Sequence, residues 1–428
     1  MQKMSDRQLF PQMSLIRQDL FRTQEMDITS RLQETLHGAV HNRQIPSGGS
    51  VAVAVGSRGI QNMDMIVRET IRFLLHSGLH PIIVPAMGSH GGGTPEAQAS
   101  LLESFGISEA SMGVPVLSSM NVTEMGSIGN KTRIFFSTDA LSCDHIVVIN
   151  RIKPHTKFRS AIESGLCKML VVGLGKKTGA AEIHQKAIHH SFTIIEEAAA
   201  HILKSCNILC GIGIIEDGYG RIAHIEAMSP EILIHREKEL LQKANQYLAR
   251  IPFQQIDILI IDHIGKDISG IGMDSNVTGR HRDITGDFQI SPHVKRIFVR
   301  DLSPLSDGNG NGIGLADFTT KRLVDAMDLE KTYINAMTAV SPEKAAIPMY
   351  FDSDLPALEA CMKTCGAKSV DSARIVRIQN TKNLEYLQIS KALKKETEKQ
   401  TKIHFATPWQ PIRFTANGNL TDFQSLLP

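Results

Sequence analysis

Several features that define whole classes of protein are scarce or absent in this chain of 428 residues. The six cysteines include no Cys-x-x-Cys and are too few for a disulfide framework, so we expect buried, reduced thiols. No apolar run approaches the roughly 18 residues of a membrane helix. The 46 basic and 44 acidic side chains leave a formal charge of +2, which provides no broad basic field for nucleic acid.

The N-terminus also lacks the apolar core of a secretory signal, which predicts a cytoplasmic protein. A chain of this length should hold two domains, because single cores rarely grow past roughly 250–300 residues. The best boundary is the segment Ala249–Phe253, which a new apolar strand, Ile256–Ile261, follows at once. We therefore predict an N-terminal domain over residues 1–250 and a C-terminal domain over residues 251–428. Residues 1–45 carry no readable function.

Short apolar runs alternate with helical patterns in both halves of the chain. Val51–Val55 and Pro81–Pro85 read as strands, and the apolar spacing from Asp64 to Gly78 reads as a helix between them. Strand, helix, strand is the unit of a parallel sheet. The sequence therefore predicts two α/β domains with mainly parallel sheets and an active-site cleft between them. A long charged helix is expected from Pro230 to Leu248, with Glu237 on its solvated face.

The segment from Asp144 to His190 carries the strongest chemical signal. A β-branched strand, Ile146–Ile149, leads directly into His155, and ligands of open α/β sheets bind beyond the carboxyl ends of strands. Lys168 and His184 follow at the edges of further apolar pieces. Each also has an ordinary interpretation: His155 as a loop residue bound to water, Lys168 as a surface amine, and His184 as one of several helix histidines.

A glycine-rich turn, Met87–Gly93, contains another histidine, His90. Thr94 is a good N-cap and Pro95 a good first residue for the helix that follows. Backbone N–H groups at such a helix start suit a phosphate or a carboxylate. The alternative is a loop whose glycines only permit a tight turn; the histidine inside the turn favours an anion site.

Four segments together resemble the nickel-dependent lactate racemase family, and more closely its shorter homologues. These are His90 in its glycine-rich turn, the pair Pro154-His155, the run Ser164-Gly165-Leu166-Cys167-Lys168, and His184. They occur in the family's order, and the resemblance is strongest from Ser50 to Arg282.

The resemblance implies a nickel-pincer nucleotide attached covalently through Lys168, with His184 as the nickel ligand. It further implies that Ser57 and Gly91 contact this cofactor. Enzymes that make the cofactor would then be partners of this protein, and no membrane or nucleic-acid partner is expected; the oligomeric state stays open.

The implied reaction is the inversion of C2 of a 2-hydroxy acid by reversible hydride transfer, which is the activity of a racemase or epimerase. Inversion needs acid/base groups on both faces of the substrate, and histidines suit either role near neutral pH. By the resemblance, His90 and His155 are these groups. Arg58 and Arg280 would bind the substrate.

Three departures from the full-length racemases affect the expected substrate. Val55 stands where they have an aspartate, and the spacing from His155 to Lys168 is a few residues longer. Their tyrosine corresponds to Thr278, and only Arg280 or Arg282 can replace their substrate-facing lysine. We therefore predict a 2-hydroxy acid other than lactate, larger or more polar.

Two other functions are consistent with the residues. Val171–Gly179 has an apolar piece before glycines, as in a nicotinamide dehydrogenase, but lacks the G-x-G-x-x-G spacing. The second is a non-catalytic protein that holds the nucleotide or nickel without turnover.

Overall fold

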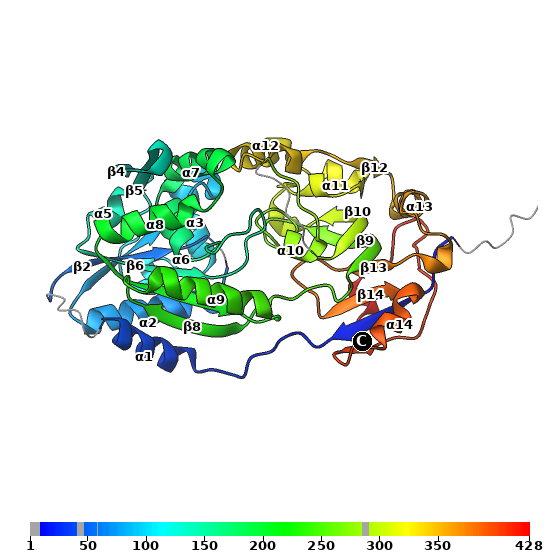
Figure 1. Ribbon diagram of the computed structural model, residues 1–428, viewed down its shortest axis with the longest axis horizontal. Coiled ribbons are helices and arrows are strands. Elements are labelled where there is room, and N and C mark those ends of the chain that lie inside the picture. The colour runs from blue at the N-terminus through cyan, green and yellow to red at the C-terminus, as the bar shows by residue number, and fades with distance from the viewer. Residues whose placement is uncertain (1–8, 41–46, 58, 285–290) are drawn as a thin grey trace, which may run out of the picture. The chain divides into compact units, whose positions relative to one another are not determined.

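The computed structural model describes residues 9–40, 47–57, 59–284 and 291–428. The chain forms two compact units: Phe21–Leu248, and Ala249–Pro428 together with the described residues up to Leu20 (Figure 1). The predicted α/β class with mainly parallel sheets is confirmed. The predicted roles of the two domains, and the cleft between them, stay predictions.

The unit Phe21–Leu248 is built on a sheet with the strand order β3-β2-β6-β7-β8. All neighbours pair in parallel except β7 and β8, which form an antiparallel hairpin. The strands are β2 (Ser50–Val55), β3 (His80–Pro85), β6 (His145–Arg151), β7 (Ile208–Glu216) and β8 (Ile222–Met228). A separate antiparallel ribbon is formed by β4 (Val122–Ile128) and β5 (Thr132–Ser137).

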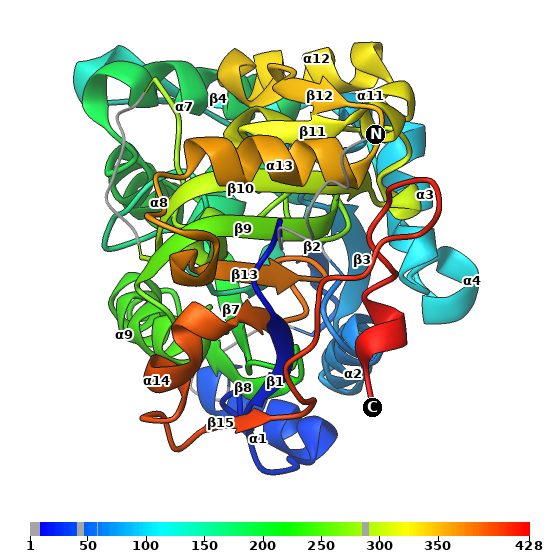
Figure 2. The same cartoon turned by 90° about the vertical axis from the view of Figure 1, so that its right-hand side faces the viewer.

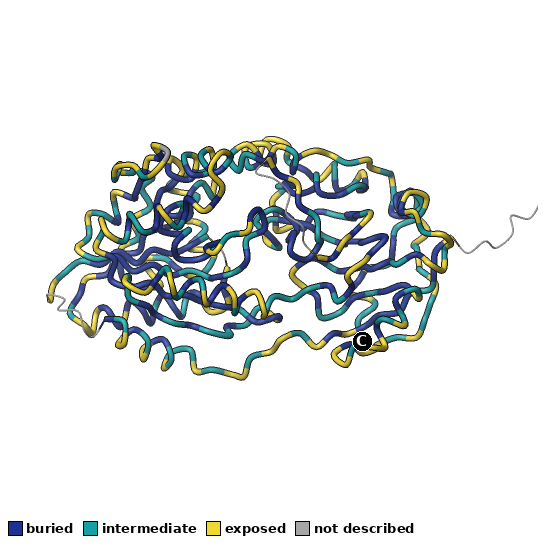
Figure 3. Tube along the Cα trace, in the orientation of Figure 1, coloured by how far each residue is buried: buried dark blue, intermediate teal, exposed yellow. Residues whose placement is uncertain are grey.

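Helices cover both faces of this sheet, which is why its strands are apolar on both sides (Figures 1 and 3). One face packs against α6 (Leu166–Lys168), α7 (Lys176–His190), α8 (Ile194–Ser205) and α9 (Leu233–Tyr247). The other packs against α1 (Ile28–Val40), α2 (Met63–His76), α3 (Pro95–Ser104) and α4 (Glu109–Met112). The short helix α5 (Thr138–Leu141) precedes β6. Each fully buried Val or Ile side chain contributes about 1.5–3 kcal/mol to this core.

The other unit contains a sheet with the strand order β12-β11-β10-β9-β13-β14-β1-β15, seen in Figure 2. The strands β9 (Gln255–Ile264), β10 (His293–Leu302), β11 (Phe318–Thr320), β12 (Met349–Phe351) and β13 (Ile375–Ile378) run in parallel. The strands β14 (Tyr386–Ser390), β1 (Met13–Gln18) and β15 (Ile403–Phe405) are antiparallel to their neighbours. The helices are α10 (Ser275–Thr278), α11 (Lys321–Asp325), α12 (Leu329–Thr338), α13 (Asp354–Thr364) and α14 (Lys394–Thr397).

Candidate active site

Three neighbouring strands end at the same edge of the first unit's sheet. In the parallel ladder Val55 of β2 pairs with Pro85 of β3 and with Ile149 of β6. The loops that carry Ser57, His90 and His155 therefore leave the sheet from adjacent strands at one edge. This is the edge at which open α/β sheets bind their ligands.

Side-chain hydrogen bonds shape the glycine-rich turn. Ser57 Oγ is hydrogen-bonded to His90 Nδ1. Gln98, fully buried in α3, donates from Nε2 to the carbonyls of Gly88 (3.0 Å) and His90 (3.1 Å). Gly91 has φ +63°, and a Cβ there would lie 3.3 Å from Ala97 Cβ, so a larger residue would be strained and crowded. His90 is thus held from β2 and from α3.

The predicted start of the following helix is confirmed. Thr94 accepts a hydrogen bond from the Ala97 N–H, and Pro95 is the first residue of α3. The cap occupies one of the N–H groups at this helix start. Anion binding there stays a prediction.

A buried amine joins the glycine-rich turn to the helical segment after Lys168. Lys176 is fully buried with φ +53°, an uncommon conformation for a residue other than glycine. Its Nζ donates to the Pro85 carbonyl over 2.8 Å, and the Gly88 N–H donates to the Gly173 carbonyl over 3.0 Å. Burial lowers the pKa of Lys176 to about 8. The turn with His90 is therefore fixed to the helical segment that carries Lys168 and His184.

Lys168 and His155 meet directly. Lys168 is the last residue of α6, and its Nζ lies 2.5 Å from His155 Nε2. The other ring nitrogen, His155 Nδ1, accepts a hydrogen bond from the Lys157 N–H over 3.0 Å.

This pair of hydrogen bonds bears on the charge of the Lys168 amine. A neutral imidazole has one N–H and one acceptor nitrogen. Because Nδ1 accepts from Lys157, the proton of His155 belongs on Nε2, which then donates to Lys168 Nζ. An ammonium group cannot accept a hydrogen bond, so opposite this tautomer Lys168 would be an uncharged amine. An uncharged lysine is a nucleophile.

Stacked aromatic rings connect this pair with His184. The rings of His155 and Phe158 stack at 4.3 Å between centroids, and those of Phe158 and Phe192 at 4.0 Å. The His184 ring meets Phe192 edge-on at 6.3 Å. Lys168 Nζ lies 5.8 Å from the centre of the Phe158 ring. The structure thus places Lys168, His155 and His184 around one aromatic pair, which sequence reasoning did not identify.

Two carboxyl groups that sequence reasoning also missed bind the backbone next to this pair, at the N–H groups of His155 and of Cys167. Glu163 Oε2 accepts the His155 N–H over 2.5 Å, and burial raises the pKa of Glu163 against the opposing effect of this bond. Glu237 Oε2 accepts the Cys167 N–H over 2.8 Å. The prediction that Glu237 lies on a solvated face is wrong, because it is fully buried. Its spacing from buried Leu233 and Leu241 carried the signal, since residues four apart share one helix face.

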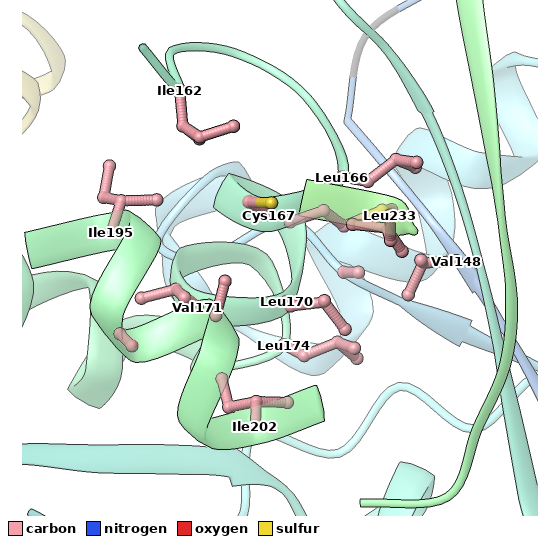
Figure 4. Packing of buried hydrophobic residues seen from close by; sticks show 14 of the residues in the cluster. Val148, Ile162, Leu166, Cys167, Leu170, Val171, Leu174, Ile195, Ile202 and Leu233 are labelled. Carbon is pink, nitrogen blue, oxygen red and sulfur yellow. The ribbon is translucent and has the colours of Figure 1, made fainter. Parts of the chain in front are cut away.

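The polypeptide around Lys168 is helical and anchored in the core. After α6 it continues as a π-helix, Met169–Gly173, and the side chains of Leu166, Cys167, Leu170 and Val171 are buried (Figure 4). π-helical turns are often found at functional sites. The strand that a nicotinamide-binding motif would need before its glycines is therefore not formed at Val171–Gly173, and that alternative loses its structural basis.

The two arginines expected to bind substrate are less informative. Arg58 lies outside the described residues. Arg280 is engaged within its own unit, where it contacts Asp317 Oδ2 (2.5 Å) and the carbonyls of Leu315 (3.2 Å) and Val294 (3.0 Å). A role for either in substrate binding stays a prediction.

Among the residues that the structure describes, no three His, Cys, Asp or Glu side chains are grouped so that they could hold a metal ion. A single imidazole such as His184 suits a metal that is bound mainly by a cofactor. In the same described ranges, no helix is long and apolar enough to cross a membrane.

No protein-family model matches this chain, and no curated protein sequence matches it. Among solved structures it is similar to the lactate racemase apoprotein from Thermoanaerobacterium thermosaccharolyticum, with 13% sequence identity and a TM-score of 0.45. The match covers 86% of this chain and 89% of that one.

Proposed function

We propose that this protein is a racemase or epimerase that inverts C2 of a 2-hydroxy acid, with a cofactor attached to Lys168. The observation that supports the proposal best is the contact between Lys168 Nζ and His155 Nε2. It pairs an uncharged, nucleophilic amine with an imidazole that can exchange a proton. Both groups lie at the sheet edge where a ligand is expected.

The residues present fit a nickel-pincer nucleotide. Covalent attachment requires an uncharged amine, which is the form in which Lys168 would accept a hydrogen bond from His155 Nε2. His184, which like His155 contacts the Phe192 ring, would supply the single protein ligand to nickel. When bound, this cofactor supplies an electron-poor carbon that accepts the C2 hydrogen as hydride.

The two histidines would move the hydroxyl proton. Glu163 accepts the backbone N–H of His155 and the Lys157 N–H occupies Nδ1, so His155 would exchange a proton with a substrate at Nε2. Ser57 holds His90 through Nδ1, so proton exchange between His90 and a substrate would take place at Nε2. Imidazole side chains in general exchange protons near neutral pH, which suits acid and base roles in either direction of the reaction.

The substrate we propose is a 2-hydroxy acid larger or more polar than lactate. Its carboxylate would be bound by Arg58, with Arg280 contributing if its contact with Asp317 opens. Enzymes that synthesise the cofactor would be the protein's partners, and the cytoplasm its compartment.

Isotope exchange tests the reaction. Protein co-expressed with the cofactor-making enzymes would be incubated with single enantiomers of several 2-hydroxy acids in D2O. Hydride return inverts C2 while keeping protium there, whereas proton abstraction would introduce deuterium. Inversion with protium retained supports the proposal, and inversion with full deuterium incorporation contradicts it. A loaded protein that inverts none of the acids would instead favour a non-catalytic carrier.

A further inference from the structure

The carboxyl group of Glu237 is an unusual group to bury. It lies in α9 with 0% of the residue exposed. In the described part of the chain, no ion pair reaches it and its Oε1 has no hydrogen-bond partner, while Oε2 accepts the Cys167 N–H at 2.8 Å. Burying a carboxyl with so few partners costs free energy, so its presence calls for an explanation beyond packing.

The local sequence is adapted to this carboxyl. A Cβ at Gly165 would lie 2.1 Å from Glu237 Oε1 and 2.7 Å from its Cδ, so only glycine fits opposite it. The Gly165 carbonyl accepts from Asn150 Nδ2 over 2.8 Å, which ties the same turn to the end of β6. Glu237 and Asn150 thus hold the start of α6 from two sides, and Lys168 follows three residues after Gly165.

We propose that Glu237 is a positioning residue for Lys168. Its carboxyl binds the first backbone N–H groups of α6 and thereby aims the Lys168 amine at His155. The proposal rests on the proposed function only in taking Lys168 as the reactive amine. Glu237 touches neither substrate nor cofactor in this role and acts through the backbone of the turn.

The strength of the hydrogen bonds between the start of α6 and the Glu237 carboxyl depends on pH. Burial raises the pKa of Glu237 to about 7, opposed by hydrogen bonds from Cys167 and the Leu166 N–H. A carboxylate accepts backbone hydrogen bonds more strongly than a carboxylic acid does. The neighbouring charged or titratable groups are the Cys167 thiol, which burial keeps protonated by raising its pKa, and the ion pair between Lys238 and Glu196 at 2.6 Å. The turn is therefore held more firmly above pH 7 than below it.

Reductive methylation with formaldehyde and cyanoborohydride, read by peptide mass spectrometry, measures this effect, because only an uncharged amine reacts. An ordinary lysine is uncharged in roughly one molecule in 2,500 at pH 7. In the full chain, Lys168 should react at least about 10-fold faster than exposed Lys204 at the end of α8. In Glu237→Ala this advantage should be lost, since the amine leaves His155 and becomes an ordinary ammonium group.

Two further variants separate positioning from folding. Glu237→Gln keeps an acceptor oxygen but cannot ionise, so its Lys168 rate relative to wild type should change by more than about 3-fold across pH 7. In Glu239→Gln, on the exposed side of the same helix, the Lys168 rate relative to wild type should not change with pH. If Glu237→Ala does not fold, the pH profile of Glu237→Gln decides: a flat ratio overturns the proposal.

The two proposals can fail separately. A fast Lys168 whose rate is within about 2-fold of wild type in Glu237→Ala overturns the positioning role and leaves the proposed function intact. If Lys168 is methylated no faster than Lys204 in wild type, Lys168 is not the reactive amine that the proposed function requires. Amide hydrogen exchange at Leu166 and Cys167 then tests whether Glu237 binds these N–H groups. Faster exchange in Glu237→Ala supports this interaction, and unchanged exchange contradicts it.

Discussion

At the scale of single residues, the candidate site depends on which nitrogen carries a proton. Lys157 occupies Nδ1 of His155, which leaves the Nε2 proton to face Lys168. Sequence reasoning could select His155 from its place after a buried strand and Lys168 from its place at the edge of an apolar piece, and the resemblance pointed to both. It could not give their hydrogen bonds, because those depend on a loop conformation that Glu163 and Phe158 fix.

His155→Phe should convert Lys168 into an ordinary ammonium group. A phenyl ring has neither an acceptor for the Lys157 N–H nor an N–H to donate to the Lys168 amine. We expect the reductive methylation rate of Lys168 at pH 7 to fall at least about 10-fold, with Lys204 unchanged as the internal control. An unaltered Lys168 rate would show that His155 does not set the charge of the amine.

Glu237 should also leave a signature in stability. Its pKa is raised from 4.5 to about 7, so the folded protein binds more protons than the unfolded one between these values. Stability due to this group therefore falls as the pH rises from 4.5 to 7, by up to about 3 kcal/mol. Glu237→Gln should be more stable than wild type at pH 8 and not at pH 5, as measured by urea unfolding at both pH values. A stability difference that is the same at both would contradict the assignment.

At the scale of elements, the buried strands were predictable from the sequence, whereas the π-helix and the strand β1 were not. The strands β2, β3, β6 and β9 are short apolar runs rich in β-branched residues, a pattern that few other structures produce. Val171 and Val172 are also β-branched but lie in the π-helix. The burial of Leu170 and Leu174 in the core outweighs the strand propensity of the two valines. Strand β1 gave no local signal, since its partners β14 and β15 lie at the far end of the sequence.

The turn before α6 provides an element-scale test. Gly165→Ala would place a Cβ 2.1 Å from Glu237 Oε1, so the turn or the helix α9 must shift. Overpacking of this kind costs about 1–3 kcal/mol. Gly38→Ala in α1 is the matched control, because nothing lies within 4 Å of its Cβ and alanine favours a helix. Urea unfolding should show a loss for Gly165→Ala and a small gain for Gly38→Ala; equal stabilities would contradict the close approach.

At the scale of the whole molecule, each unit has its own sheet and its own core, and the second unit buries a network of charges. Asp262 in β9 accepts two hydrogen bonds of 2.7 Å from Arg377 and a third from Arg300. Arg300 also donates to Asp354 over 2.7 Å. Sequence reasoning did not find this network, because its members come from distant parts of the chain.

Asp262→Asn should destabilise the second unit by about 3–5 kcal/mol, because it removes the charge between two buried guanidinium groups. Exposed Asp325→Asn, which breaks the surface pair with Lys321, should cost less than about 1 kcal/mol. Thermal unfolding followed by calorimetry can resolve the two units. A loss below 1 kcal/mol for Asp262→Asn would show that the network is dispensable.

The central claim is that Lys168 anchors an organic cofactor. The most direct test is the intact mass and nickel content of protein co-expressed with the cofactor-making enzymes, compared with Lys168→Ala and the surface control Lys204→Ala. We expect added mass on the Lys168 peptide in wild type and in Lys204→Ala, and none in Lys168→Ala. Equal added mass in all three proteins would contradict it, as would wild-type protein without any added mass.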